Sequence, residues 1–107
     1  MLPKKNRVNT KEVEKIFKEG KFINSPNLTF KFVLTNREER RISFIAPKNI
    51  AKLAVKRNFL RRRGYSVLKK YFSDFPLGLI GVFVFKKPIN SILELENEIK
   101  IILAKIN

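Results

Sequence analysis

LGLIGVFVF, at Leu77–Phe85, is the longest apolar run in this sequence of 107 residues. It is about half as long as a membrane-spanning helix needs to be, so it predicts no membrane span. From Leu79 onward both alternating sets of side chains are apolar, which is typical of an interior strand covered on both faces of its sheet. Pro88 marks the end of the run. The run therefore predicts a buried strand at the centre of the fold.

Two segments before this run have the period of strands. Leu28–Thr35 alternates between large apolar side chains and a more polar set, and Arg41–Ala46 resumes as a strand after the polar turn Asn36–Glu39. The simplest interpretation is a β-hairpin. A further short strand is compatible with Lys21–Asn24.

Apolar residues recur at helical spacing in three other segments. The first is Thr10–Glu19, where Asn9 and Glu12 form a capping box. The third begins after Ser91 and runs to the C-terminal end. Its predicted apolar face consists of Ile92, Leu95, Ile99, Ile102, Leu103 and Ile106.

The second helical segment is strongly basic, starts at about Ile50 or Ala54 and ends at Phe72. Phe59 falls outside the apolar stripe and points outward. Gly64 falls within the stripe, where a glycine costs helix stability and indicates close packing or a weak point. The predicted stripe consists of Leu53, Leu60, Gly64, Val67, Leu68 and Tyr71.

The order of these elements predicts a single α+β domain over residues 1–107, in which helices pack on one mixed sheet. Twenty-four Lys and Arg against nine Asp and Glu leave a formal charge of +15, which indicates a polyanionic partner. The absence of His and Cys excludes a histidine base, a cysteine nucleophile, a disulfide and a zinc finger. We expect no signal peptide, and we expect a cytoplasmic location.

The basic residues are concentrated in one part of the chain. Residues 40–73 contain eleven Lys and Arg and no acidic residue. A charged face that serves only for solvation usually has Glu interleaved, because opposite charges at helical spacing relieve repulsion. In residues 40–73 no acidic residue relieves the repulsion between the basic side chains, which favours a nucleic-acid surface. The arginines at the centre of this run suit bidentate binding of phosphate.

The sequence of this helix is similar to a known signature. Ala54–Arg62 reads AVKRNFLRR and resembles the helical signature of the protein subunit of bacterial ribonuclease P, which has Arg-Asn-Arg, an aliphatic residue and two basic residues. Four other pieces resemble parts of the same family in the same order. They are Leu2–Arg7, Ile16–Lys21, Pro47–Ile50 and Phe85–Pro88.

The resemblance implies both a fold and a function. The fold is an α+β sandwich of order αβββαβα, with a mixed sheet and a left-handed βαβ crossover (ribosomal protein S5 domain 2-like). The function is that of the protein subunit of an RNA-based endonuclease that removes the 5′ leader from precursor tRNA. In that enzyme the large RNA holds Mg²⁺ and performs the hydrolysis. The protein binds that RNA and the leader, and it is expected to have no catalytic residue and to bind no metal or cofactor itself.

Carried over by position, the resemblance assigns two sets of residues. The leader-binding set is Val13, Phe17, Thr29 and Lys31, although an aromatic residue such as Phe17 on a short helix is also typical of a core. The set that faces the catalytic RNA is Lys48, Lys52, Lys56, Arg57, Asn58, Phe59, Arg61 and Arg62.

The sequence departs from the family pattern in three places. Phe59 stands in place of the second arginine of the signature, so one phosphate contact is lost, but an outward ring can stack on an RNA base. Arg63–Tyr65 replaces an aliphatic pair followed by Arg, and Val13 stands where an aromatic residue is common. Together they indicate a divergent member with an altered RNA contact.

Three other functions share some of these features. The main alternative is a ribosomal or ribosome-associated RNA-binding protein with no role in tRNA processing. A membrane-surface protein is disfavoured by a narrow apolar stripe that contains Gly64 and by the lack of Trp. A protein-only nuclease would need clustered carboxylates for Mg²⁺, and Glu94, Glu96 and Glu98 cannot all share one helical face.

Overall fold

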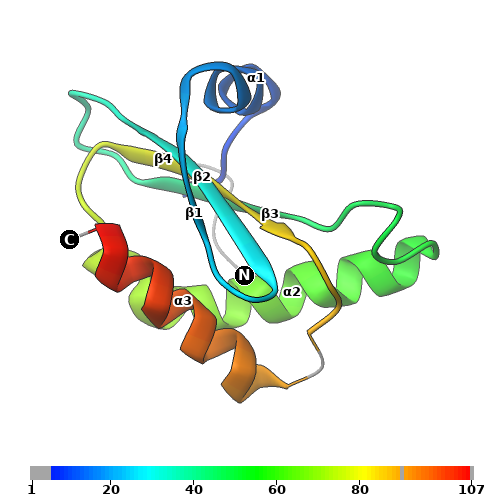
Figure 1. Ribbon diagram of the computed structural model, residues 1–107. Helices are drawn as coiled ribbons and strands as arrows, with labels where there is room; N and C mark the ends of the chain where they lie inside the picture. The colour runs from blue at the N-terminus through cyan, green and yellow to red at the C-terminus, as the bar shows by residue number, and fades with distance from the viewer. Residues whose placement is uncertain (1–5, 90, 107) are drawn as a thin grey trace.

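The computed structural model describes residues 6–89 and 91–106. A four-stranded sheet separates two helical layers, with α1 on one face and with α2 and α3 side by side on the other (Figure 1). The elements are α1 (Thr10–Glu19), β1 (Lys21–Asn24), β2 (Leu28–Leu34), β3 (Arg41–Ile45), α2 (Ala54–Tyr71), a short 3₁₀ turn (Phe72–Asp74), β4 (Leu79–Phe85) and α3 (Ile92–Ile106). The order αβββαβα is thus confirmed.

β4 is an interior strand, as predicted. The sheet order is β1-β2-β4-β3, with β4 antiparallel to β2 and parallel to β3. The predicted hairpin between Leu28–Thr35 and Arg41–Ala46 is therefore wrong, because these two strands do not pair. β4 is apolar on both faces, so only an interior position buries both of its sides. The short polar turn between β2 and β3 instead carries the chain past the place that β4 fills.

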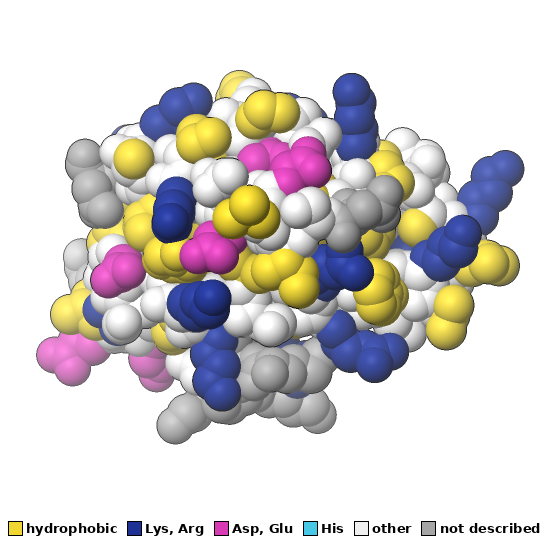
Figure 2. All heavy atoms as spheres, turned by 90° about the horizontal axis from the view of Figure 1, so that it is seen from below, with side chains coloured by type: hydrophobic (Ala, Val, Ile, Leu, Met, Phe, Trp, Pro, Cys, Tyr) yellow, Lys and Arg dark blue, Asp and Glu magenta, His cyan; other side chains and the backbone are white. Residues whose placement is uncertain are grey.

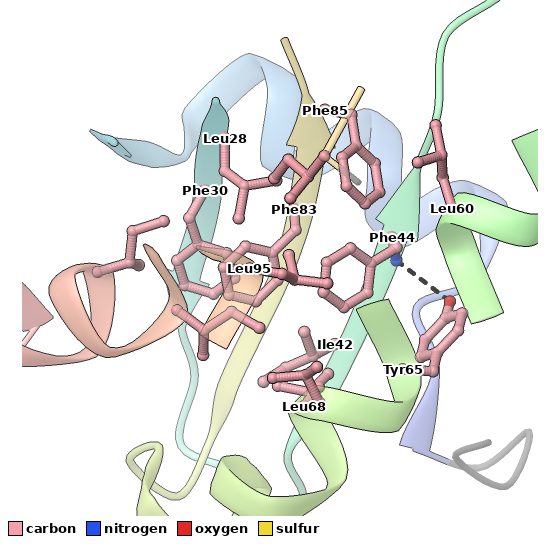
Figure 3. Close-up of a cluster of buried hydrophobic side chains, with 14 of the residues drawn as sticks. Leu28, Phe30, Ile42, Phe44, Leu60, Tyr65, Leu68, Phe83, Phe85 and Leu95 are labelled. Atoms are coloured by element: carbon pink, nitrogen blue, oxygen red, sulfur yellow. Dashed lines mark hydrogen bonds between the residues drawn. The ribbon is translucent and has the colours of Figure 1, made fainter. Parts of the chain in front are cut away.

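The larger core lies between the sheet and the layer of α2 and α3 (Figure 3). Phe83 of β4 is at its centre, with its ring centroid 4.3 Å from that of Phe30 and 4.9 Å from that of Phe44. α3 supplies Leu95, Ile99 and Ile102, all fully buried, as the helical spacing predicts. A smaller cluster on the other face holds α1, through Ile16 against Ile80 and Val82.

α1 and α2 begin differently. The predicted capping box of α1 is present, because the Asn9 side chain accepts the N–H of Glu12 and the Glu12 carboxylate accepts the N–H of Asn9. α2 starts at Ala54 with Leu53 as an uncapped N-cap residue. Leu53 is 60% exposed, so its place in the apolar stripe is corrected. It lies before the first helical turn, and the stripe includes the buried Tyr65 instead.

Gly64 marks a close approach between α2 and the sheet, as one of the two interpretations of this glycine predicts. A Cβ built at this position would lie 2.7–2.9 Å from the ring of Phe44. That ring is also fixed from other sides, since it stacks on Phe83 and meets Tyr65 edge-on. The Tyr65 hydroxyl accepts the backbone N–H of Phe44 at 3.1 Å (Figure 3).

Gly64→Ala is expected to destabilise the protein by up to about 2 kcal/mol. Alanine gains about 1 kcal/mol in helix propensity, but overpacking of a well-fixed core costs about 1–3 kcal/mol. Urea denaturation of the variant measures the difference. Ser66→Ala, at an exposed position two residues along the same helix, is the control and is expected to be neutral or slightly stabilising. A stabilised Gly64→Ala would show that Phe44 yields easily.

A buried carboxylate joins α3 to the turn between β1 and β2. Glu98 is only 3% exposed. Its Oε1 accepts the Ser25 hydroxyl at 2.6 Å and the backbone N–H of Asn27 at 2.7 Å, and its Oε2 accepts Asn27 Nδ2 at 2.7 Å. A buried charge that is satisfied in this way fixes one end of the sheet against the helical layer.

A second polar contact joins α3 to α2. The Tyr71 hydroxyl donates a short hydrogen bond to the Glu96 carboxylate, and Lys70 Nζ lies 4.0 Å from the same carboxylate. The hydrogen bond from Tyr71 is the main reason why the pKa of Glu96 is below its usual value, and the same bond raises the pKa of Tyr71. α2 is therefore held at its C-terminal end, and its N-terminal half remains at the surface.

Candidate nucleic-acid interface

All eight residues predicted to face the catalytic RNA lie on α2 or on the loop before it, and we call this set the α2 surface. Six of its members are exposed, namely Lys48, Lys52, Lys56, Asn58, Phe59 and Arg62, while Arg57 and Arg61 are half-buried. Phe59 is 53% exposed. The molecule seen from below the sheet has blue side chains projecting at the right-hand edge, where α2 begins, and no magenta side chains at that edge in this view (Figure 2).

The charges on the α2 surface are not neutralised by the protein's own carboxylates. Within residues 6–89 and 91–106, Arg57, Arg61 and Arg62 form no ion pair with an acidic side chain. The ion pairs of the described part involve Glu12, Glu39 and Glu96. The last of these acidic residues pairs with Lys70, near the C-terminal end of α2. The N-terminal half of α2 therefore presents a net cationic surface.

Arg57 has a structural role that the sequence did not indicate. Its Nη1 donates to the carbonyl of Ala51 at 3.0 Å and to that of Lys52 at 2.8 Å. These carbonyls belong to the loop that leads into α2, where no side chain caps the helix. Arg57 therefore holds the loop that carries Lys48 and Lys52 against the first turn. On the next turn, Arg61 Nη1 donates to Asn58 Oδ1 at 3.2 Å.

Other basic residues of the run 40–73 are engaged within the fold. Arg40 Nε donates to the carbonyl of Phe75 at 2.6 Å. Arg41 lies 3.1 Å from both Glu12 and Glu39, and the carboxylate of Glu12 is the main reason why the pKa of Arg41 is raised. These two arginines stabilise β3 and its neighbours, so the long basic run divides into a structural part and an exposed part.

The predicted leader-binding residues lie on the opposite side of the sheet, beside α1. Lys31 Nζ is 4.7 Å from the ring centroid of Phe17, which is 45% exposed. Thr29 donates to Asn24 Oδ1 at 2.8 Å. Val13 packs against the small cluster under α1 instead. The structure thus brings Phe17, Thr29 and Lys31 to one face and places Val13 at its buried margin.

Two residues extend this face that sequence reasoning did not single out. Phe22 is directly opposite Lys31 in the β1–β2 ladder and is 64% exposed, and Asn24 is opposite Thr29. Opposed residues of an antiparallel pair project to the same face. The alternation within Lys21–Asn24 was the available signal, but a four-residue strand is too short for its period to be read. Phe17, Phe22, Asn24, Thr29 and Lys31 together are called the sheet-face surface.

A hollow of about 580 Å³ lies where the N-terminal segment passes between β3 and α2. Its lining includes Arg7, Arg41 and Arg61. Val8 anchors the segment by donating its backbone N–H to Ser43 Oγ at 2.8 Å. Sequence reasoning did not find this hollow, because its members come from three elements that are far apart in the chain.

Two kinds of feature are missing from the described residues. No group of three or more acidic side chains in residues 6–89 and 91–106 is arranged so that it could hold a metal ion. None of the helices in that part of the chain has the length and apolar character needed to cross a membrane.

Comparison with known proteins gives one family. The family model for ribonuclease P matches residues 2–107, and no curated protein matches the sequence. The solved RNase P protein of Staphylococcus aureus aligns with a TM-score of 0.80 and 19% identity, over 94% of this chain and 96% of that one. The RNase P protein of Thermotoga maritima aligns with a TM-score of 0.82 and 18% identity, over 94% and 97%. At these identities the two structures show a shared fold.

Proposed function

The chain belongs to the ribonuclease P protein family, and from this membership we propose that it is the non-catalytic accessory subunit that binds the catalytic RNA and the 5′ leader of precursor tRNA. The observation that carries the proposal is the cationic α2 surface, which no acidic side chain of the described protein neutralises. We also propose a cytoplasmic location.

We assign the catalytic RNA to the α2 surface. Folded RNA presents closely spaced phosphates, and cations that displace its counterions supply much of the binding free energy. Arg61 and Arg62 lie in the N-terminal half of α2, and Lys52 lies on the loop before it. Arg57 supports this geometry by fixing the loop. A patch of this kind favours a shaped polyanion over a small anionic ligand.

We assign the 5′ leader to the sheet-face surface. A single-stranded leader has bases that can stack on aromatic rings and phosphates that attract cations. Phe17 and Phe22 supply exposed rings, and Lys31, over the ring of Phe17 and opposite Phe22 in the ladder, supplies a cation. Thr29 and Asn24 add hydrogen-bonding groups on the same face. The two surfaces lie on different faces of the sheet, so one protein molecule has room for both RNAs.

The chemistry of cleavage is assigned to the RNA partner and to the Mg²⁺ that it binds. The sequence has no His or Cys to serve as a base or nucleophile. Its carboxylates at Glu12, Glu96 and Glu98 are engaged with side chains of the protein itself. The work of this chain is to neutralise phosphates and to hold the leader.

Reconstitution tests the proposal. The chain is added to a bacterial ribonuclease P RNA at low Mg²⁺, and removal of the 5′ leader from precursor tRNA is measured. We expect the protein to accelerate cleavage by that RNA and to cleave nothing by itself in Mg²⁺. Cleavage by protein from which all RNA has been removed would refute the accessory role. Tight binding to ribosomal RNA with no effect on leader removal would indicate the ribosomal alternative.

Phe17→Ala is expected to weaken binding of precursor tRNA by the reconstituted enzyme by about tenfold, because one stacked base contributes about 1–3 kcal/mol. The fold tolerates this change, since nearly half of the side chain is exposed. Binding is measured in parallel with mature tRNA, which has no leader and serves as the control. An equal loss for both RNAs would show that Phe17 does not contact the leader.

A further inference from the structure

An exposed aromatic side chain lies in the middle of the cationic surface. Phe59 is 53% exposed, and Val55, one turn earlier on the same line of α2, is 68% exposed. Large apolar groups that are grouped at a surface commonly mark a binding site. In this protein they share that surface with Lys52 and Lys56, so the partner must offer both apolar and anionic groups.

The ring of Phe59 is held in place from one side. Arg63, one turn further along α2, has its Cζ 4.4 Å from the ring centroid, which is a cation–π contact. Arg63 is itself anchored, because its Nη1 donates to the carbonyl of Ile89 at 3.4 Å. The ring of Phe59 therefore has a partner within the protein, and more than half of the residue stays exposed.

A hollow of about 520 Å³ adjoins the ring. Its walls include Ile50, Ala51, Leu60 and Pro88, and Lys52 and Lys56 lie on its lining with Phe59. Small-ligand clefts have volumes of about 300–1,000 Å³, so a flat group of the size of a base fits in this space. An apolar wall with two lysines beside it suits a nucleobase, because a base in RNA has phosphates on both sides.

We propose that Phe59 and this hollow form a seat for one unpaired nucleobase of the bound RNA, with Lys52 and Lys56 against the flanking phosphates. The proposal rests on the proposed function and deepens it by naming what the α2 surface reads. Charge selects this occupant. A second copy of the chain also carries +15 and would be repelled, whereas RNA supplies a flat base and negative charge together.

The absence of tryptophan from the sequence gives a direct test. Phe59→Trp introduces the only indole of the protein, and its fluorescence is followed during titration with oligoadenylate, with catalytic RNA and with a fully paired RNA duplex of equal phosphate number. We expect quenching by the first two and none by the duplex. Leu77→Trp, at an exposed loop position, is the matched control and should not be quenched.

Phe59→Leu provides a second measurement that needs no reporter. We expect its affinity for oligoadenylate to fall by about tenfold and its affinity for the duplex to stay within about twofold, because only the single strand offers a base to stack. Leu77→Ala is the control.

Three results would overturn the seat. The first is that oligoadenylate binds the Phe59→Trp variant without quenching its indole. The second is that Phe59→Leu loses affinity equally for oligoadenylate and for the duplex. The third is that anionic lipid vesicles quench the indole whereas RNA does not. The accessory role would survive any of these results, since it is refuted by a failure to stimulate cleavage or by cleavage by the protein alone.

Discussion

Replacing Arg61 and Arg62 together with glutamine is expected to weaken binding to the catalytic RNA by about 10- to 100-fold. Each charge-assisted hydrogen bond to phosphate is worth about 1.5–3 kcal/mol, and part of it is regained from water and ions. The slope of log K against log salt concentration is expected to become shallower by about two, one for each charge removed. Filter binding at several salt concentrations measures both quantities.

The control for this variant removes the same charge from other places. Lys11 of α1 and Lys105 of α3 are both exposed, so Lys11→Gln combined with Lys105→Gln lowers the net charge by two without touching α2. An equal loss of affinity in the control would mean that only total charge matters. Arg57 is left intact in both variants, because its hydrogen bonds hold the loop before α2. A variant without Arg57 would lose affinity through a displaced loop as well as through a lost contact with RNA.

Glu98→Ala is expected to lower the free energy of unfolding by about 2–4 kcal/mol. The substitution removes three hydrogen bonds to a charged group and leaves the backbone N–H of Asn27 without its acceptor. Domains of this size have a total stability of about 5–15 kcal/mol, so the loss is a large fraction of it. In a thermal scan the midpoint should fall by about 10–20 °C.

Glu94 offers a matched control one turn earlier on α3. Its carboxylate is exposed and accepts a single hydrogen bond, from Asn27 Nδ2 at 2.8 Å. Glu94→Ala should change stability by no more than about 0.5 kcal/mol. Were the two variants equally destabilised, the effect would come from loss of charge on α3 and not from the buried network.

Local patterns in the sequence predicted the individual elements well. The α1 capping box, the interior character of β4 and the outward position of Phe59 each depend on near neighbours in the chain, and each is confirmed by the structure. The helical period of α3 likewise identified Leu95 and Ile99 as core residues.

Features that depend on distant partners were not predictable in this way. The strand order is one, because the short turn after β2 favoured a hairpin and nothing local showed that β4 would take the place between β2 and β3. Glu98 is another, since its hydrogen-bond donors lie more than 70 positions away in the sequence. In a single sequence it has the same character as its exposed neighbour Glu94.

The candidate site shows the same division. The basic residues of α2 could be identified from charge and from the family signature. The anchoring of Arg57 to the preceding loop and the hollow beside Phe59 could not, because both require the path of the chain before the helix. Phe22 was not predicted, because its strand of four residues is too short for an alternating pattern to be recognised in the sequence.

The insertion of β4 between β2 and β3 has a consequence for synthesis. On the ribosome the nascent chain exposes β2, β3 and the basic α2 before the strand that joins β2 to β3 has been translated. Sheets whose pairings span long loops pay chain entropy before they gain contacts, and they fold slowly. β2 and β3 therefore lack the strand that joins them until Leu79–Phe85 has been synthesised.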